Sequence, residues 1–228
     1  MLSHSHKKAM QGVDLFHDIS DEEYASLVHC LSPQVKCYSK NEILLLTGDT
    51  VHDIGIILDG TACAYIDHIN GSHTLISNLA PTSVFGEVLV STKTHKSPVT
   101  IYATSDVTAA FIDYKKIYSM CTTACPAHSL FLQNMIMTIS KKYFTLFDRI
   151  AILKEKTLRG KIMAYLYSLS KNDKSTTVHI PYSKTMLADY ILANRSALSK
   201  ELKKMEEDGL IVVNGREVEL ILITNINH

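Results

Sequence analysis

The 228-residue chain lacks tryptophan and has few prolines (five), glycines (nine) and cysteines (five). An odd number of widely spaced cysteines does not suit the disulfide framework of a small secreted protein. No apolar run reaches the 18 residues of a membrane span and no signal-peptide pattern is present, so we expect a soluble cytoplasmic protein. A Gly-rich phosphate loop, a His-Glu-x-x-His motif, a Gly-x-Ser-x-Gly elbow and a convincing carboxylate pair are all missing, which argues against an enzyme.

The chain also lacks net charge, because 23 basic residues balance 23 acidic ones. The two signs are unevenly distributed along the sequence. Residues 1–153 hold 11 basic against 14 acidic side chains, whereas residues 154–228 hold 12 against 9. Contacts with phosphate need a local surplus of positive charge, so we expect any nucleic-acid surface in the C-terminal third.

That C-terminal third has the pattern of two short helices joined by a tight turn. The first helix buries one face, made of apolar residues at helical spacing: Met186, Leu187, Tyr190 and Ile191. Residues 192–194 interrupt the pattern, and Asn194 suits the N-cap of the second helix. The second helix buries Leu198, Leu202 and Met205, and Gly209 ends it.

Hydrogen-bonding side chains gather on the other face of the second helix, within an arc of about 140°: Arg195, Ser196, Ser199, Lys200 and Lys203. In a major groove, an arginine can pair with a guanine edge, serines can meet bases or phosphates, and lysines suit phosphates. A strand then runs into Asn214-Gly215, a type I′ turn signal, and a second strand returns. This hairpin supplies a wing. The alternative, a solvated basic face on an ordinary helix pair, does not account for the hairpin.

The first two thirds of the chain change from helical to β-rich texture. Ser20 and Glu23 form a capping box that predicts a helix over 21–31. Between residues 34 and 114, short strands are predicted at 42–46, 54–58, 63–66, 74–79, 99–103 and 107–112. Turn signals separate them, which indicates an antiparallel roll or barrel.

A long helix follows, with an unbroken heptad seam: Leu132, Ile136, Ile139, Tyr143, Leu146, Ile150 and Leu153. Such a seam is typical of a two-stranded helix pair, the alternative being a lone helix packed on its own domain. The sequence therefore predicts an α+β protein with an N-terminal antiparallel, jelly-roll-like β-roll, a dimerisation helix and a C-terminal winged helix-turn-helix. We place the sensor domain at 1–125, the dimerisation helix and hinge at 126–154, and the DNA-binding domain at 155–228.

This order of parts resembles the Crp/Fnr superfamily of bacterial transcription regulators. The resemblance is carried by Asn194-Arg195-Ser196, the segments 202–206 and 209–211, the Asp59-Gly60 turn, Phe85-Gly86-Glu87 and Ala103. It implies a homodimer that reads a two-fold symmetric double-stranded operator, with RNA polymerase as a partner that such regulators can contact. Base-reading positions would be Arg195, Ser196 and Lys200. The full set of DNA-binding candidates is Ser183, Lys184, Thr185, Asn194, Arg195, Ser196, Ser199, Lys200, Lys203 and Arg216.

The resemblance is weaker at the effector site. Cyclic-nucleotide-binding members follow Gly-Glu, ten residues later, with Arg-Ser or Arg-Thr, whose arginine pairs with the cyclic phosphate. Here Ser97-Pro98 occupy that place. The candidate pocket residues are Gly86, Glu87, Val88, Ser97, Pro98, Val99, Leu146 and Phe147. A buried anion without its cation is strongly destabilised, so we expect no binding of cyclic AMP, and Glu87 to be a structural carboxylate. The cofactor or effector stays unknown.

Two alternatives remain. One is a regulatory module whose roll binds a small ligand and whose C-terminal helices dock on a protein rather than on DNA. The other is metal or redox sensing. Iron–sulfur members carry clustered cysteines near the N-terminus, but this chain has none before Cys30. Cys30 and Cys63 suit small apolar core positions. Cys121, Cys125 and His128 would align on one helix face and are weak metal candidates, although Pro126 should start a new helix there. The roll histidines His52, His68 and His73 show no haem-like spacing.

Overall fold

The computed structural model describes residues 4–119 and 126–221. The chain forms two compact units, Met1–Lys142 and Tyr143–His228. The boundary falls within the 29-residue helix α5 (Pro126–Lys154), whereas the sequence-based division set this helix apart as a segment of its own. Among the described helices, none has the length and apolarity needed to span a membrane.

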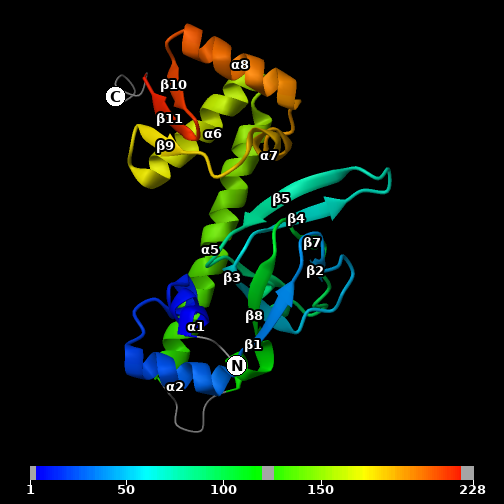
Figure 1. Ribbon diagram of the computed structural model, residues 1–228, viewed down its shortest axis with the longest axis vertical. Coiled ribbons are helices and arrows are strands. Elements are labelled where there is room, and N and C mark those ends of the chain that lie inside the picture. Colours follow the sequence, from blue (N-terminus) through cyan, green and yellow to red (C-terminus); the bar gives the residue numbers. More distant parts are fainter. Residues whose placement is uncertain (1–3, 120–125, 222–228) are drawn as a thin grey trace. The chain divides into compact units, whose positions relative to one another are not determined.

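Two four-stranded antiparallel sheets form the roll of the first unit (Figure 1). One sheet has the order β1 (Gln34–Tyr38), β8 (Val107–Asp113), β3 (Asp53–Asp59), β6 (Val84–Phe85). The other has the order β2 (Ile43–Leu45), β7 (Thr100–Ala103), β4 (Ala62–Asp67), β5 (His73–Leu79). All six strands expected from the sequence are present, which confirms the predicted roll. Strands β1 and β6 were not predicted.

Strand β3 explains how the roll is packed on two sides. Ile54, Ile56 and Leu58 belong to the core that the sheet shares with the helices, while Ile57 belongs to the core inside the roll. Alternate side chains of a strand point to opposite faces, so a strand covered on both faces reads as a continuous apolar run. The Phe85 ring packs so closely over Gly55 that an added Cβ would lie 2.0 Å from it, and only glycine fits there.

Helices cover the outer face of the β1–β8–β3–β6 sheet. They are α1 (His4–Gln11), the 3₁₀ helix η1 (Asp14–Phe16), α2 (Asp21–Leu31) and the first part of α5. The predicted capping box of α2 is confirmed, since Glu23 N donates to Ser20 Oγ and Ser20 N donates to Glu23 Oε2. The short helices α3 (Glu87–Val90) and α4 (Tyr114–Tyr118) complete the unit.

The second unit contains the end of α5, then α6 (Leu158–Asp173), α7 (Lys184–Tyr190) and α8 (Arg195–Glu207), with a three-stranded antiparallel sheet (Figure 1). The sheet has the order β10 (Ile211–Asn214), β11 (Glu217–Leu220), β9 (Thr177–His179). Leu166, Leu187, Leu198 and Val218 lie in one shared core. The predicted winged helix-turn-helix is confirmed, and β9, a strand that was not predicted, is its third strand.

Candidate DNA-binding surface and effector site

The start of α8 is fixed by an N-cap. Asn194 Oδ1 accepts hydrogen bonds from Ser196 N at 2.8 Å, from Ala197 N at 3.4 Å and from Ser196 Oγ at 2.6 Å. The cap satisfies amide groups that have no partner within the helix. It therefore sets the position of Arg195 and Ser196, which form the first turn of α8 and are both exposed.

The two faces of α8 separate as the spacing predicts. Leu198, Leu202 and Met205 are buried. Of the opposite set, Arg195, Ser196, Lys200 and Lys203 are exposed, and Ser199 is half-buried. Lys203 lies 3.8 Å from Glu207, but both side chains are largely in water, where such a pair contributes little. The structure thus brings the five residues to one face that has long or polar donors at its N-terminal end.

Ser183, Lys184 and Thr185 lie at the start of α7 and are exposed. Ser183 is the N-cap, and its Oγ accepts a hydrogen bond from Met186 N at 3.2 Å. Lys184 is the first residue of the helix. Main-chain amides and a lysine at a helix N-terminus favour an anion such as phosphate.

The wing turn differs from the sequence prediction. Asn214 pairs with Glu217, so the two central residues are Gly215 and Arg216, not Asn214 and Gly215. Only Gly215, with φ +64°, has a positive φ, whereas a type I′ turn needs two such residues. The predicted type I′ turn is therefore wrong, and a glycine with positive φ at the first central position is typical of type II′. The exposed Arg216 consequently lies at the tip of the wing.

Two ion pairs of Arg159, which the sequence did not predict, hold α8 against α6. Arg159 Nε lies 2.6 Å from Glu201 Oε1, and Arg159 Nη1 lies 2.6 Å from Asp208 Oδ2. Both acidic residues are on the side of α8 away from Arg195, Lys200 and their neighbours. Binding both at once fixes the position of α8 along α6, and the single charge of the guanidinium offsets part of the negative charge of the two carboxylates.

In the first unit, the Gly86-Glu87 segment opens the short helix α3. Gly86 has φ +84°, and a Cβ there would lie 2.8 Å from Asp53 O, so the turn requires glycine. The Glu87 side chain is 2% exposed, and its Oε1 lies 2.7 Å from Nζ of Lys142 on α5. Lys142 Nζ also donates a hydrogen bond to Val84 O at 2.6 Å. Oε1 is therefore paired with a cation from the same chain, whereas the buried Oε2 has no hydrogen-bond partner among the described residues.

Ser97 and Pro98 do not supply a replacement cation. Ser97 is buried, and its Oγ donates to Val99 O at 2.7 Å, while its main-chain N–H donates to Asp49 O at 3.0 Å. Pro98 is exposed and has no N–H to donate. Val88 is exposed and Val99 is half-buried. The donors that a cyclic phosphate would need are thus absent from this pair, and the serine hydroxyl is already bonded to the main chain.

Two family models match the chain, one in the roll and the other in the winged helix-turn-helix. The cyclic nucleotide-binding domain matches residues 35–124, and the Crp-like helix-turn-helix domain matches residues 160–227. The chain belongs to the Crp/Fnr superfamily of transcription regulators. Members of this superfamily are DNA-binding regulators rather than enzymes, which agrees with the missing catalytic motifs.

Solved Crp/Fnr-type structures share the fold over most of the chain. CooA from Carboxydothermus hydrogenoformans, solved as a double mutant, is 20% identical, with a TM-score of 0.69 over 92% of this chain and 93% of its own. The c-di-GMP responsive regulator CLP of Xanthomonas campestris is 18% identical, with a TM-score of 0.64 over 86% and 98%. FixK2 of Bradyrhizobium japonicum is 14% identical, with a TM-score of 0.61 over 83% and 92%. Among curated proteins, none matches the chain in sequence.

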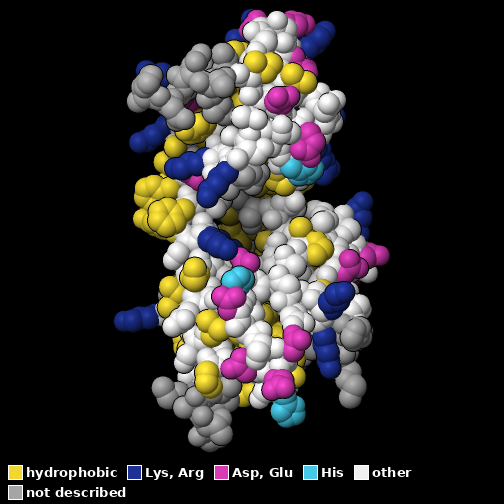
Figure 2. Space-filling view, turned by 90° about the vertical axis from the view of Figure 1, so that its left-hand side faces the viewer, with side chains coloured by type: hydrophobic (Ala, Val, Ile, Leu, Met, Phe, Trp, Pro, Cys, Tyr) yellow, Lys and Arg dark blue, Asp and Glu magenta, His cyan; other side chains and the backbone are white. Residues whose placement is uncertain are grey.

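The heptad seam of this Crp/Fnr chain is largely exposed. Ile136, Tyr143, Leu146 and Ile150 are 62%, 59%, 54% and 49% exposed. Leu132 and Ile139 are half-buried against the helical core of the first unit, and Leu153 is half-buried as well. Phe147, which with Leu146 was among the candidate pocket residues, is also 54% exposed, and both residues belong to the second unit. Hydrophobic side chains also stand out on the face of the molecule drawn in Figure 2.

The cysteine predictions have a mixed outcome. Cys63 is buried as expected, but Cys30 is exposed, because α2 buries Tyr24, Leu27 and Leu31 instead. Cys121 and Cys125 lie outside the described residues. His128 is buried in α5, which begins at Pro126 as predicted. Within residues 4–119 and 126–221, no three His, Cys, Asp or Glu side chains are grouped so that they could hold a metal ion.

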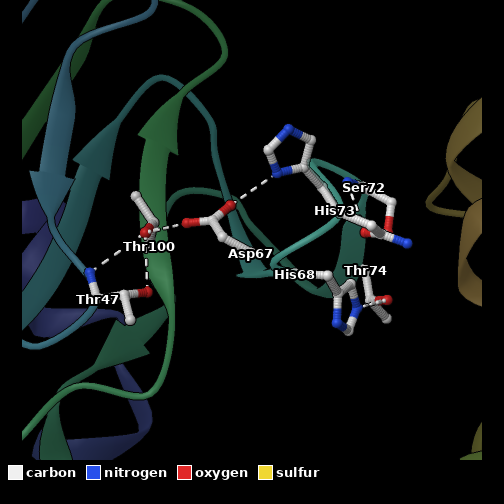
Figure 3. Close-up of polar contacts among 8 residues, drawn as sticks. Thr47, Asp67, His68, Ser72, His73, Thr74 and Thr100 are labelled. Carbon is white, nitrogen blue, oxygen red and sulfur yellow. Dashed lines mark hydrogen bonds and ion pairs between the residues drawn. The ribbon is translucent and has the colours of Figure 1, made fainter.

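Two of the roll histidines, His68 and His73, take part in polar contacts around the β4–β5 hairpin (Figure 3). Asp67 on β4 accepts a 2.6 Å hydrogen bond from Thr100 on β7 and lies 2.7 Å from Nδ1 of His73 on β5. Thr100 in turn lies 2.9 Å from the hydroxyl of Thr47. The hydrogen bonds from Thr100 and His73 hold the pKa of Asp67 below its usual value. This network links neighbouring strands of the sheet and accounts for His73 as a structural residue.

Proposed function

We propose that this chain is a homodimeric, sequence-specific DNA-binding regulator whose α8 reads the major groove of a two-fold symmetric operator. The observation that supports it most strongly is the exposed face of α8, where Arg195, Ser196 and Lys200 follow directly after a capped helix start. Long or polar donors at the N-terminal end of such a helix are the groups that reach base edges. Lys184 and Arg216 would contact phosphates on either side of the recognition helix.

The exposed heptad seam of α5 supports the dimer. Four apolar side chains on one face, each about half in water, gain free energy when a second copy covers them. Two copies can bind one duplex when their half-sites lie about one helical turn, ~34 Å, apart. A contact with RNA polymerase belongs to the same proposal, since a regulator bound near a promoter acts on transcription through the polymerase. Its place of action would be the cytoplasm, where bacterial DNA lies.

For the roll, we propose an effector site that does not take cyclic AMP. The Lys142–Glu87 pair supports this, because the carboxylate that would meet a ribose hydroxyl is held by an internal cation. The bonded hydroxyl of Ser97, where an arginine would face the phosphate, supports it as well. A different small molecule or a redox change would act by altering the roll and shifting α5, and so the register of the two recognition helices.

Operator selection from random duplex DNA tests this function, with the full-length chain under reducing conditions at about 0.1 M salt. We expect an enriched palindrome, and an affinity that falls steeply with salt as counterions are released. A chain that enriches no sequence, with and without added metabolite extract, would instead favour a module that acts through protein contacts.

A further inference from the structure

The C-terminal end of α7, where the helix-turn-helix turn begins, is held by two cations. Main-chain carbonyls in the last turn of a helix have no partner within that helix. Tyr190 O accepts a hydrogen bond from Arg149 Nε at 3.2 Å, and Ile191 O accepts one from Lys161 Nζ at 3.2 Å. Arg149 comes from the end of α5 and Lys161 from α6, so both earlier helices of this unit are tied to the same turn.

Arg149 is buried against the ring of Tyr190. It is 9% exposed, and its guanidinium carbon lies 4.4 Å from the centre of the Tyr190 ring. The Tyr182 ring stacks on the Tyr190 ring, with the two ring centres 5.1 Å apart. Burial lowers the pKa of Arg149, although an arginine stays charged. A buried guanidinium is costly unless it is well bonded, so its place against the carbonyl and the ring is closely defined.

The turn between α7 and α8 is short, so a displacement at its start also moves the N-terminal end of α8. Leu192 has φ +52°, a left-handed conformation that costs free energy for a non-glycine residue. Ala193 N donates to Ala188 O at 2.8 Å, and the next residue is the Asn194 cap. A shift of the Tyr190 carbonyl would therefore displace the first turn of α8, which carries Arg195.

We propose that Arg149, assisted by Lys161, is a positioning residue for operator reading: it fixes the turn between α7 and α8 to the end of α5. The side chain lies inside the second unit and not on the exposed face of α8, so it acts through the turn and not by touching DNA. This inference rests on the proposed DNA-binding function. It gives the second unit an internal link from the dimer helix to the recognition helix.

The test compares R149M, R149K and the control K154M in the full-length chain. K154M removes the same charge from an exposed position at the end of the same helix. The probes are the operator selected by the unchanged chain and an unrelated duplex of equal length. For R149M we expect operator affinity to fall at least about tenfold, from the loss of a charged hydrogen bond, while affinity for the unrelated duplex stays the same. R149K keeps the positive charge but loses the planar guanidinium that lies over the Tyr190 ring, so its operator affinity should fall between those of the unchanged chain and R149M. K154M should change neither affinity.

Two results would overturn the proposal. One is an equal loss of affinity for both duplexes in R149M, which would make Arg149 a general charge contribution. The other is a lowered unfolding temperature with unchanged operator affinity, measured well below that temperature, which would make it a packing residue only. If R149M does not fold, Y190L serves in its place, because it removes the ring and keeps the carbonyl, with Y190F as its control.

Amide hydrogen exchange of the free protein provides a measurement independent of DNA. In R149M, or in Y190L if that variant is used, we expect the amides of residues 192–197 to exchange about tenfold faster, while those of α6 keep their protection. Unchanged exchange at 192–197 would contradict the proposal. If the unchanged chain selects no operator, the proposed function fails, but the exchange experiment still decides whether Arg149 holds the turn.

Discussion

The two units treat their polar side chains in opposite ways. In the roll, Glu87 is neutralised by Lys142, and the Ser97 hydroxyl is bonded to Val99 O. In the winged unit, the cations on the outer face of α8 stay in water. A buried carboxylate whose charge is already paired with a cation offers a ligand less than exposed cations offer a polyanion. The difference shows that matching a family's residue pattern is not enough: whether a site can take a ligand depends on what its groups already bind.

The largest effect is expected from a substitution in the α5 seam. Two copies of α8 are needed to bind a two-fold symmetric operator, so a weakened dimer also weakens DNA binding. Leu146→Lys would place two ammonium groups in an apolar seam, and we expect the dimer to weaken by roughly a hundredfold or more. Sedimentation velocity measures this. Ala151→Lys, exposed and outside the seam, is the control. An unchanged dimer in Leu146→Lys would mean that the copies associate elsewhere.

Removing the cation from the roll comes next. Lys142→Met leaves Glu87 buried without its partner, and we expect the free energy of unfolding of the first unit to fall by about 3 kcal/mol. Lys141→Met breaks the exposed pair with Asp14, at 2.7 Å, and should cost under about 1 kcal/mol. Denaturant unfolding followed within the roll compares the two. The double variant Glu87→Gln/Lys142→Met should regain much of the loss, and equal losses in the two single variants would refute the role of the internal pair.

On the DNA side, Arg195→Ala should cost roughly 1–3 kcal/mol of operator affinity and relax base preference at one position in each half-site. Lys203→Ala should instead weaken all sequences about equally and reduce the salt slope by about one. Competition binding against a panel of single-base operator variants distinguishes them. A uniform loss for Arg195→Ala would show that this arginine contacts phosphate, not a base.

The smallest effect is expected at the helix cap. Asn194→Ala removes the acceptor of two main-chain amides and should cost about 1 kcal/mol of stability in the second unit, while Asn194→Asp should retain most of it. Thermal unfolding monitored in that unit provides the values. Equal stability of Asn194→Ala and the unchanged chain would mean that packing alone starts α8.

Local signals were read correctly from the sequence. The caps at Ser20 and Asn194, the two faces of α8 and the start of α5 at Pro126 all depend on neighbouring residues. Strands β1, β6 and β9 were missed because they are short and depend on partners distant in sequence. The wing turn was misplaced by one residue, since Asn-Gly is a signal whose register only the strand pairing decides.

The effector site was predictable only in what it lacks. The sequence shows that Ser97-Pro98 stand where an arginine is expected, but not that Lys142 reaches Glu87 from a helix far along the chain. Arg149 could not be singled out either, because its partner is a main-chain carbonyl and its ring contact is made by tertiary packing. Both cations lie on α5, where the heptad pattern draws attention to the apolar residues instead.

A calorimetric titration of cyclic AMP into the full-length chain tests the contrast between the two units most directly. We predict no binding heat, because Glu87 already has its cation and no arginine faces the phosphate. A dissociation constant of about a micromolar, near 8 kcal/mol of binding free energy, would contradict the account, since Lys142 would then have to yield its place to the nucleotide.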